Sequence, residues 1–373
     1  MAKSNIIATI DYGQIAANAS SIIRFTETPL MAVVKADAYG HGIVPSAHAA
    51  IFGGATWIGT AFLDEAIKLR QGGITAPILA WLSPPSEDFR QAFDWGIDLS
   101  VSSLDQLQAI VSQGDVIGCK PRIHLEVDTG MTRGGALEEF PALVGAIGKL
   151  IDQKRIELVG TWSHLACSDE PEHPLNQQQG ERFQAALEYL KAKGISPGIR
   201  HIANSGGVIH FPHLYYDMVR SGILLYGYAP STGFKGCPNV LPVMELSAVV
   251  VLVKKVPAGA SIGYGATVRL FEDRYIGLIA LGYADGIPRR LEGPMQIWCT
   301  IKGEKFPLIG RVSMDQITVD LGAETTVQAG DRAVLFGGDK SATADDWARA
   351  AGTISYEILS KIGARATRVA RVH

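Results

Sequence analysis

One stretch of the chain, residues 31–42, reads Met31-Ala32-Val33-Val34-Lys35-Ala36-Asp37-Ala38-Tyr39-Gly40-His41-Gly42. The apolar residues before Lys35 predict a buried strand, and the glycine-rich segment after it predicts the loop where that strand leaves its sheet. Lys35 is therefore expected at a strand end, partly desolvated against a packed core. Partial desolvation lowers the pKa of an ammonium group and frees the amine to act as a nucleophile or a base. The alternative is a lysine that snorkels to solvent at the tip of the strand.

Residues 30–230 alternate short apolar runs with amphipathic stretches, which predicts strands separated by helices. The expected strands are Met31–Val34, Trp57–Thr60, Ile78–Trp81, Ile97–Val101, Arg122–Val127, Leu158–Trp162, Arg200–Ala203 and Met218–Val219. The expected helices include Asp64–Arg70, Glu87–Phe93, Leu104–Val111, Ala142–Ile151 and Gln177–Lys191. This count predicts an α/β fold with a (β/α)₈ TIM barrel. An open doubly wound sheet is the alternative, but the sequence contains no G-x-G-x-x-G or G-x-x-x-x-G-K-[ST] fingerprint.

After about Phe234 the pattern changes to strand-like runs punctuated by glycine and proline. They are Met244–Val253, Tyr275–Leu281, Gln296–Ile301, Gln316–Leu321 and Ala333–Phe336. One clear helix is expected among them, beginning at Thr343, where Asp346 makes a near capping box. The sequence therefore predicts a barrel over residues 10–234 and a mostly β domain over residues 235–373.

Composition excludes several classes of protein. Lys and Arg number 34 against 37 Asp and Glu, a net charge of −3, and there is no basic run, so nucleic acid is not an expected partner. No 18 uncharged apolar residues follow one another, and the apolar run Ile6–Ile10 is too short for a signal sequence, so we expect no membrane association and a cytoplasmic location. A periplasmic location of a processed chain is the alternative. The cysteines Cys119, Cys167, Cys237 and Cys299 lie far apart without metal-ligand spacing, which predicts free thiols and no metal site.

The segment Lys35–Gly42 closely resembles the pyridoxal-phosphate lysine motif of alanine racemases, Lys-Ala-Asn/Asp-Ala-Tyr-Gly-His-Gly. Further motifs of that family recur in family order over nearly the whole chain. The resemblance implies a pyridoxal-phosphate-dependent enzyme of fold type III, with pyridoxal 5′-phosphate attached to Lys35 and with Tyr39 among the cofactor-binding residues. It also implies that the N-terminal strand, residues 1–9, joins the β domain. The resemblance further implies a homodimer whose active sites are shared between subunits.

Polar groups at the ends of the last two barrel strands are expected to hold the cofactor, because barrel active sites lie at the carboxyl ends of the strands. Ser205, in the small-residue segment 203–207, suits a phosphate, although an ordinary strand-to-helix turn with serine as N-cap is the alternative. Arg220 is surrounded in sequence by apolar residues, so its charge is expected to be buried and to require a partner, either an internal ion pair or a cofactor. By resemblance, Arg220 faces the pyridine nitrogen, and Gly222 and Ile223 of the same segment contact the cofactor.

Two aromatic residues complete the cofactor site by resemblance. His164 ends the sixth expected strand and is implied to hydrogen-bond Arg220, although a lone histidine is often a satisfied core residue. Tyr356, in the segment 354–357, matches the tyrosine that touches the phosphate.

The β domain is implied to supply the second base and part of the substrate site. Tyr264 matches the family's second catalytic base, opposite Lys35, which requires cations or hydrogen bonds that lower a phenol pKa normally near 10. Arg133 and the backbone N–H of Met314 are implied to bind the substrate carboxylate. The segments around Tyr283 and Arg311, together with Asp169 and Asp315, match the second shell and access corridor of the family.

Glu126 departs from the common family pattern. Many members carry a lysine there, which is carbamylated to an anion that orients the arginine matched by Arg133. A glutamate supplies a negative charge without modification, so Glu126 could keep that interaction. The alternative is a solvated strand residue.

These residues predict an amino-acid racemase that interconverts L- and D-alanine by a two-base mechanism and supplies D-alanine for peptidoglycan. The alternatives are a racemase of broader specificity that accepts serine or basic amino acids, a related pyridoxal-phosphate-dependent decarboxylase, and a non-catalytic cofactor-binding protein. A decarboxylase would lack the Tyr264 and Met314 segments in racemase form. A non-catalytic binding protein would lack the C-terminal domain.

Overall fold

The computed structural model describes residues 4–230, 238–291, 293 and 296–372. The chain forms two compact units, one made of Met1–Gln14, Tyr39–Gly42 and Pro242–His373 and the other of Ile15–Ala38 and Ile43–Leu241. The boundary expected between residues 234 and 235 lies outside the described residues, as does Cys237. The other three cysteines, Cys119, Cys167 and Cys299, are free thiols.

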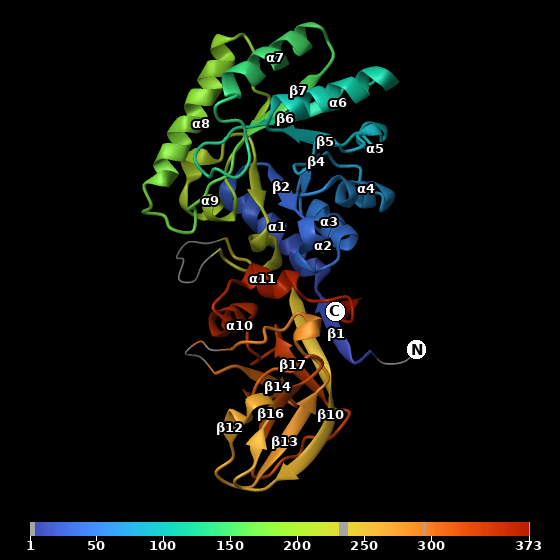
Figure 1. Cartoon of the computed structure of the whole chain (residues 1–373), viewed down its shortest axis with the longest axis vertical. Coiled ribbons are helices and arrows are strands. Elements are labelled where there is room, and N and C mark those ends of the chain that lie inside the picture. The colour runs from blue at the N-terminus through green and yellow to red at the C-terminus, as the bar shows by residue number, and fades with distance from the viewer. Residues whose placement is uncertain (1–3, 231–237, 292, 294–295, 373) are drawn as a thin grey trace. The chain divides into compact units, whose positions relative to one another are not determined.

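The larger unit contains the predicted barrel (Figure 1). Its eight strands are β2 (Leu30–Val33), β3 (Trp57–Thr60), β4 (Ile78–Ala80), β5 (Asp98–Val101), β6 (Arg122–Glu126), β7 (Glu157–Trp162), β8 (Ile199–His201) and β9 (Val219–Ser221). They pair in parallel in the order β8-β7-β6-β5-β4-β3-β2-β9. Two backbone hydrogen bonds close the ring between β8 and β9, from Asp217 N to Arg200 O (3.0 Å) and from Arg220 N to Ala203 O (2.9 Å).

Helices lie on the outside of these strands (Figure 1). They are α1 (Tyr12–Thr26), α3 (Ile43–Phe52), α4 (Leu63–Gln71), α5 (Arg90–Asp94), α6 (Leu104–Ile117), α7 (Phe140–Asp152), α8 (Leu175–Ala192) and α9 (Ser205–His210). Helices α4 to α8 confirm the five expected helices, whereas α1, α3 and α9 were not predicted. All four residues of β2 are buried, as expected of a parallel strand covered on both faces.

The smaller unit is built on a second eight-stranded sheet of mixed direction. Its strands are β1 (Ile6–Ile10), β10 (Met244–Val256), β13 (Arg274–Ile279), β14 (Trp298–Ile301), β15 (Glu304–Ile309), β16 (Ile317–Gly322), β17 (Arg332–Phe336) and β18 (Thr367–Ala370). Their order is β13-β16-β15-β14-β17-β10-β1-β18, and β13 also pairs with β10, so six of the strands form a ring. The N-terminal strand β1 pairs with β10 and β18.

Helix α10 (Ala344–Ala351) begins as the sequence predicts, because Thr343 and Asp346 form a reciprocal capping box. Its Trp347 is fully buried and donates through Nε1 to the carbonyl of Leu335 on β17 (2.9 Å). The expectation of a single helix in this domain was wrong. A second helix, α11 (Ser355–Ser360), follows α10 and has only six residues, too few for a clear hydrophobic periodicity.

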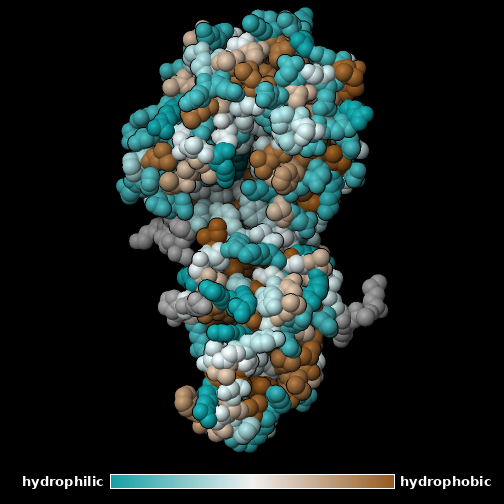
Figure 2. Space-filling view, in the orientation of Figure 1, coloured by the Kyte–Doolittle hydropathy of each residue, from teal (hydrophilic) through white to brown (hydrophobic). Residues whose placement is uncertain are grey.

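The outer face seen in Figure 2 is mostly hydrophilic, with scattered hydrophobic residues, as is usual for a globular surface. Among the described residues, no helix has the length and apolar character needed to cross a membrane. No group of three or more His, Cys, Asp or Glu side chains with metal-binding geometry occurs in the described part of the chain.

Candidate active site

Lys35 follows the end of β2 and opens an unusual turn, α2 (Lys35–Tyr39). The backbone of Ala36, Asp37 and Ala38 is left-handed, with φ of 54°, 53° and 56°. Left-handed turns of L-residues are rare because Cβ approaches the following carbonyl, at a cost of roughly 1–2 kcal/mol per residue. The chain therefore requires compensating contacts to hold Lys35 in this position.

Glu65, on α4, supplies such contacts. Its Oε1 accepts a hydrogen bond from the backbone N–H of Ala36 (2.6 Å), and its Oε2 accepts from those of Ala61 (2.9 Å) and Phe62 (3.1 Å). One carboxylate thus ties the left-handed turn to the loop after β3. Glu65 cannot be recognised from the sequence, because a glutamate in the first turn of a helix has no distinctive pattern.

The surroundings of Lys35 lower its pKa, as predicted. Burial is the largest cause, the positive charges of Arg133 and Arg220 act in the same direction, and the negative charge of Glu65 opposes them. The Lys35 Nζ lies 5.7 Å from the ring centre of Trp81, the residue after β4. Trp81 is a contact that sequence reasoning missed, since the apolar run 78–81 gave it only a strand assignment.

Arg220 lies in the middle of β9 and is 4% exposed. Its two terminal nitrogens donate to carbonyl oxygens of neighbouring strand ends, His201 O (2.8 Å) and Ser163 O (2.7 Å). The Nε–H donates to no acceptor among the described residues. Burial lowers the pKa of Arg220 to about 9, and the negative charge of Glu126 opposes this shift.

His164 lies at the hydrogen-bonding distance from Arg220 that the resemblance implied. Its Nδ1 is 3.2 Å from Arg220 Nη2, and its Nε2 is 3.4 Å from the side-chain amide of Asn204. Burial and the charges of Arg220 and Arg133 hold the pKa of His164 well below its ordinary value. A neutral imidazole accepts at one nitrogen, so His164 can accept the arginine N–H.

Ser205 is the first residue of α9 and is buried. The N-cap of this helix is Asn204, whose side chain accepts from Gly207 N (3.0 Å), so the alternative reading of Ser205 as N-cap is wrong. The Ser205 Oγ instead accepts from the backbone N–H of Gly222 (3.2 Å). Gly222 directly precedes η2 (Ile223–Tyr226), so Ser205, Gly222 and Ile223 gather at the carboxyl ends of β8 and β9.

Glu126, the last residue of β6, accepts a hydrogen bond from Ser102 Oγ (2.7 Å). Burial raises the pKa of Glu126, while that hydrogen bond and the charges of Arg220 and Arg133 lower it. Glu126 is therefore not a solvated strand residue. Within residues 4–230, however, no hydrogen bond or ion pair joins it to Arg133, whose side chain is exposed, so the charge of Glu126 acts on Arg133 at longer range.

Five predicted residues of the smaller unit lie on three neighbouring loops: Tyr264, Tyr283, Arg311, Met314 and Asp315. Tyr264 opens η3 (Tyr264–Ala266) and is 69% exposed. The loop after β13 carries Tyr283, whose N–H donates to Ser313 O (3.0 Å), and Ala284, whose N–H donates to Met314 O (2.9 Å). These bonds fix the segment of Met314 beside that of Tyr283.

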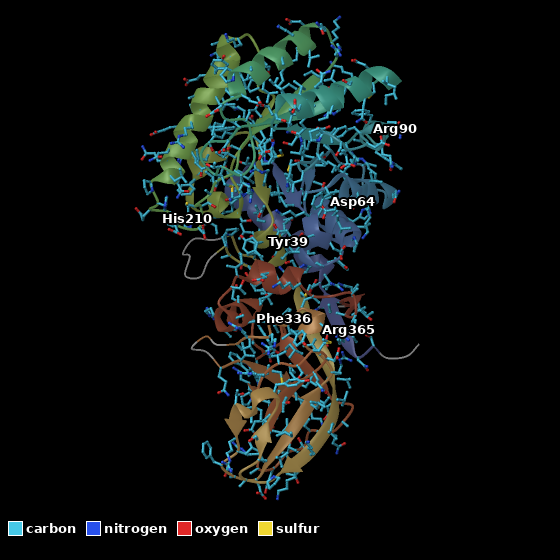
Figure 3. All side chains as sticks on the ribbon, in the orientation of Figure 1. Tyr39, Asp64, Arg90, His210, Phe336 and Arg365 are labelled. Carbon is cyan, nitrogen blue, oxygen red and sulfur yellow. The ribbon has the colours of Figure 1, made fainter. Side chains whose placement is uncertain are left out.

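Side-chain contacts join the same loops. Arg365, labelled in Figure 3, donates to Asp285 (2.7 Å) and to Asp315 (2.7 Å). The guanidinium of Arg311 passes so close to Gly265 that a Cβ there would lie 2.9 Å from Nη1. Arg311 therefore packs against the turn that presents Tyr264.

Three predicted residues lie elsewhere. Tyr39 is buried in the smaller unit, with its ring centre 6.0 Å from that of Tyr356 on α11. Burial raises the pKa of the Tyr39 phenol. Asp169 is exposed on the loop between β7 and α8 of the larger unit.

Comparison with known proteins finds relatives that match nearly the whole chain. Residues 10–230 match the family model described as alanine racemase, N-terminal domain, and residues 243–370 match that of alanine racemase, C-terminal domain. The alanine racemase of Salinispora tropica is 43% identical over 98% of this chain and 97% of its own length.

Solved structures give the same result. The crystal structure of alanine racemase from D-cycloserine-producing Streptomyces lavendulae is similar with a TM-score of 0.96 and 39% identity, covering 100% of this chain and 98% of that one. The alanine racemase of Bacillus anthracis with bound L-Ala-P is similar with a TM-score of 0.90 and 35% identity, covering 99% of this chain and 96% of that one. A lysine of lowered pKa after the first barrel strand, a buried arginine on the last one and sequence similarity across both units together place the chain in the alanine racemase family.

Proposed function

We propose that this protein interconverts L- and D-alanine, with pyridoxal 5′-phosphate attached to Lys35. The observation that carries the proposal is that Lys35, whose pKa is lowered, follows the first barrel strand, while Arg220 is buried on the adjacent strand β9 and contributes to that lowering. The family membership of both units supports it.

The residues present fit this cofactor. Lys35 offers an amine, and Arg220 offers an Nε–H that has no acceptor among the described residues. Ser205, whose Oγ accepts from the Gly222 N–H, has a hydroxyl hydrogen that could be donated to a phosphate at these strand ends. When bound, pyridoxal phosphate supplies a ring that withdraws electrons from the Cα of an attached amino acid and so acidifies its proton.

The chain's own groups then move that proton. Lys35 takes or returns it at Cα on one face, and Tyr264 does so on the opposite face, so that a proton taken from one side and returned to the other inverts the centre. Arg220 would donate to the pyridine nitrogen of a bound cofactor, which would keep that nitrogen unprotonated and limit how much charge the ring withdraws. Arg133 and the backbone N–H of Met314 bind the substrate carboxylate.

We also propose a homodimer in which Lys35 of one subunit and Tyr264 of the other serve one active site. Tyr39 and Tyr356 would contact the cofactor, and Asp169, Tyr283, Arg311 and Asp315 would belong to the corridor and its supporting shell. The expected domain limits, 10–234 and 235–373, the cytoplasmic location and the role in peptidoglycan synthesis stay predictions. L-Ala-P, found with the Bacillus anthracis relative, supports alanine as the substrate.

The test measures enantiomer composition by chiral chromatography after incubation with L-alanine or D-alanine. The native protein should convert either one to an equal mixture and show the visible absorption of bound pyridoxal phosphate. Lys35→Ala should lose both properties, whereas Lys191→Ala, an exposed lysine on α8, should keep them. Full racemisation by Lys35→Ala would overturn the proposal.

A substrate panel separates the alternatives. L-serine and L-lysine test a racemase of broader specificity, and release of CO₂ tests a decarboxylase. Binding of the cofactor with no conversion of any amino acid would favour a non-catalytic protein.

A further inference from the structure

A chain of four buried side chains crosses the inside of the barrel and ends on Arg220. The Arg220 Nη1 lies 3.1 Å from His201 Nδ1, His201 Nε2 lies 3.1 Å from His124 Nδ1, and His124 Nε2 lies 3.3 Å from Asp98 Oδ2. Asp98, His124 and His201 are each 1% exposed or less. They come from β5, β6 and β8, and the sequence analysis assigned none of them a role.

The chemistry of these groups permits one direction of donation. A guanidinium only donates, and a neutral imidazole donates at one nitrogen and accepts at the other. His201 Nδ1 must therefore accept from Arg220, so its Nε2–H donates to His124. His124 then accepts at Nδ1 and donates through Nε2–H to the carboxylate of Asp98. A second proton on His124 would place its Nδ1–H against the Nε2–H of His201. A second proton on His201 would place its Nδ1–H against the N–H of Arg220.

The electrostatics of His201 and the packing around both rings favour the same state, in which the imidazoles are neutral and donate through Nε2–H. Burial and the charge of Arg220 hold the pKa of His201 well below its ordinary value. The ring of Trp162 stacks on His201 with an interplanar angle of 3° and lies under Arg220, whose Cζ is 4.8 Å from the ring centre. The ring of Trp57 meets His124 edge-on, with centres 5.4 Å apart. These aromatic walls leave the imidazoles little freedom to rotate.

Asp98 anchors the far end of the chain. It is the first residue of β5, and Arg122, the first residue of β6, donates to it through Nε (2.7 Å) and Nη2 (3.3 Å). This relay, the hydrogen-bonded series Asp98, His124, His201 and Arg220, therefore begins at the amino-terminal ends of the strands and ends on β9 next to the candidate site. Both carboxylate oxygens of Asp98 thus accept from Arg122, and Oδ2 also faces His124 Nε2.

We propose that Asp98 and His124 are positioning residues, which act through His201 to hold Arg220 in one orientation towards the cofactor ring. Asp98 sets the direction of donation in these hydrogen bonds, because its carboxylate can only accept. His124 must therefore donate to Asp98, His201 to His124, and Arg220 to His201. Because neither imidazole can rotate, the Arg220 Nη1 keeps its hydrogen bond to His201. The Nε–H is then left to donate to the cofactor ring. The part of this proposal that concerns the ring rests on the proposed function.

The first test measures the protonation of the two imidazoles in the full-length protein, labelled with ¹⁵N in histidine. The signals are assigned by their loss in His124→Gln and His201→Gln. We expect both rings to be neutral Nε2–H tautomers, because the hydrogen-bond pattern gives each ring one donor and one acceptor position. A charged ring or an Nδ1–H tautomer at either position would overturn the proposal. This measurement needs no racemase activity, so it stands apart from the proposed function.

The second test uses Asp98→Asn, which keeps the shape and removes the charge. An amide group offers both a donor and an acceptor, so His124 should lose its single tautomer, and kcat should fall roughly tenfold with little change in KM, because an interaction of the reacting state is affected. Thr161→Val is the matched control. Thr161 lies on strand β7, which neighbours β6 and β8, is fully buried and donates to Pro197 O (2.8 Å), a partner that belongs neither to the relay nor to the tryptophans beside it. Unchanged tautomers and kcat in Asp98→Asn, or equal changes in Thr161→Val, would refute the positioning role.

Discussion

Glu126 lies in surroundings that disfavour its charged form. Burial raises the pKa of its carboxyl group above the ordinary 4.5, although Ser102 and two arginines pull in the other direction. A carboxyl whose folded-state pKa is raised contributes stability that is fully present below the unfolded pKa and is lost as pH rises through the folded pKa. Ionisation of Glu126 in the folded protein therefore costs folding free energy.

We predict that Glu126→Gln separates stability from activity. The substitution removes the buried charge, so the variant should gain stability relative to the native protein as pH rises above 4.5, and chemical denaturation at acidic and neutral pH measures this. Its kcat/KM should fall roughly tenfold, since Arg133 and Arg220 lose a nearby negative charge. Native kinetics in this variant would mean that Glu126 does not act on either arginine.

Bicarbonate tests whether Glu126 replaces a carbamate. Activity of the native protein should not respond to added bicarbonate, and its intact mass should show no carbamate adduct. Glu126→Lys should lose activity at low bicarbonate and regain it as bicarbonate rises. A bicarbonate response of the native protein would contradict this assignment.

Tyr264 is 69% exposed on its short turn, next to Arg311. If it serves one face of the substrate and Lys35 the other, Tyr264→Phe should slow removal of the α-proton from one enantiomer by roughly a hundredfold and affect the other far less. Exchange of the α-proton with deuterated solvent, followed separately for L- and D-alanine, measures this. Tyr275→Phe on β13 is the control. Equal, small losses for both enantiomers would make Tyr264 a structural residue.

At the scale of elements, the left-handed turn after β2 depends on a helix that is distant in sequence. Glu65 of α4 accepts from Ala36 with one oxygen and from the loop before α4 with the other. Glu65→Gln would turn one of these acceptors into a donor facing an N–H group.

We predict that Glu65→Gln loosens this turn. Amide hydrogen exchange in the intact protein, measured on the proteolytic fragment that covers residues 34–42, should become roughly tenfold faster. A backbone hydrogen bond is lost from a strained segment. Asp64→Asn is the matched control, since Asp64 is the neighbouring acid on α4 (Figure 3), and the structure gives its carboxylate a hydrogen bond with Glu65 N. Native exchange in Glu65→Gln would show that the turn is held by other contacts.

At the scale of the whole molecule, the candidate residues divide between the two compact units. Lys35, Arg133 and Arg220 belong to the larger unit, and Tyr264 and Met314 to the smaller one. The proposed dimer joins the two sets from different subunits.

Subunit mixing tests this arrangement. Lys35→Ala and Tyr264→Phe each damage every site of their own homodimer, but a hybrid dimer with shared sites contains one site in which both residues are intact. Random exchange of subunits should therefore restore about a quarter of native activity per dimer. Native-gel or mass analysis confirms that hybrids form. Hybrids without a gain in activity would show that Lys35 and Tyr264 act within one chain.

The sequence by itself determined the alternation of elements and the position of Lys35. Apolar runs such as Met31–Val34 and Trp57–Thr60 have the length and β-branched content of buried parallel strands, and each lies within a residue or two of its observed limits. Helix α3 was missed because it is apolar on nearly all sides and carries Pro45 in its first turn, so it shows no helical stripe. The roles of Tyr264 and Met314 came from family resemblance, because an exposed tyrosine and methionine carry no pattern of their own.

The tertiary structure alone decided which polar residues inside the barrel meet. His124 and His201 are 77 positions apart, and Asp98 and His124 are 26 apart, so only the order and register of the parallel strands bring them together. The left-handed turn at Ala36 was equally hidden, because alanine and aspartate at these positions do not signal a conformation that glycine prefers. Local propensity and periodicity depend on neighbours in sequence, whereas the environment of a buried charge depends on closure of the whole barrel.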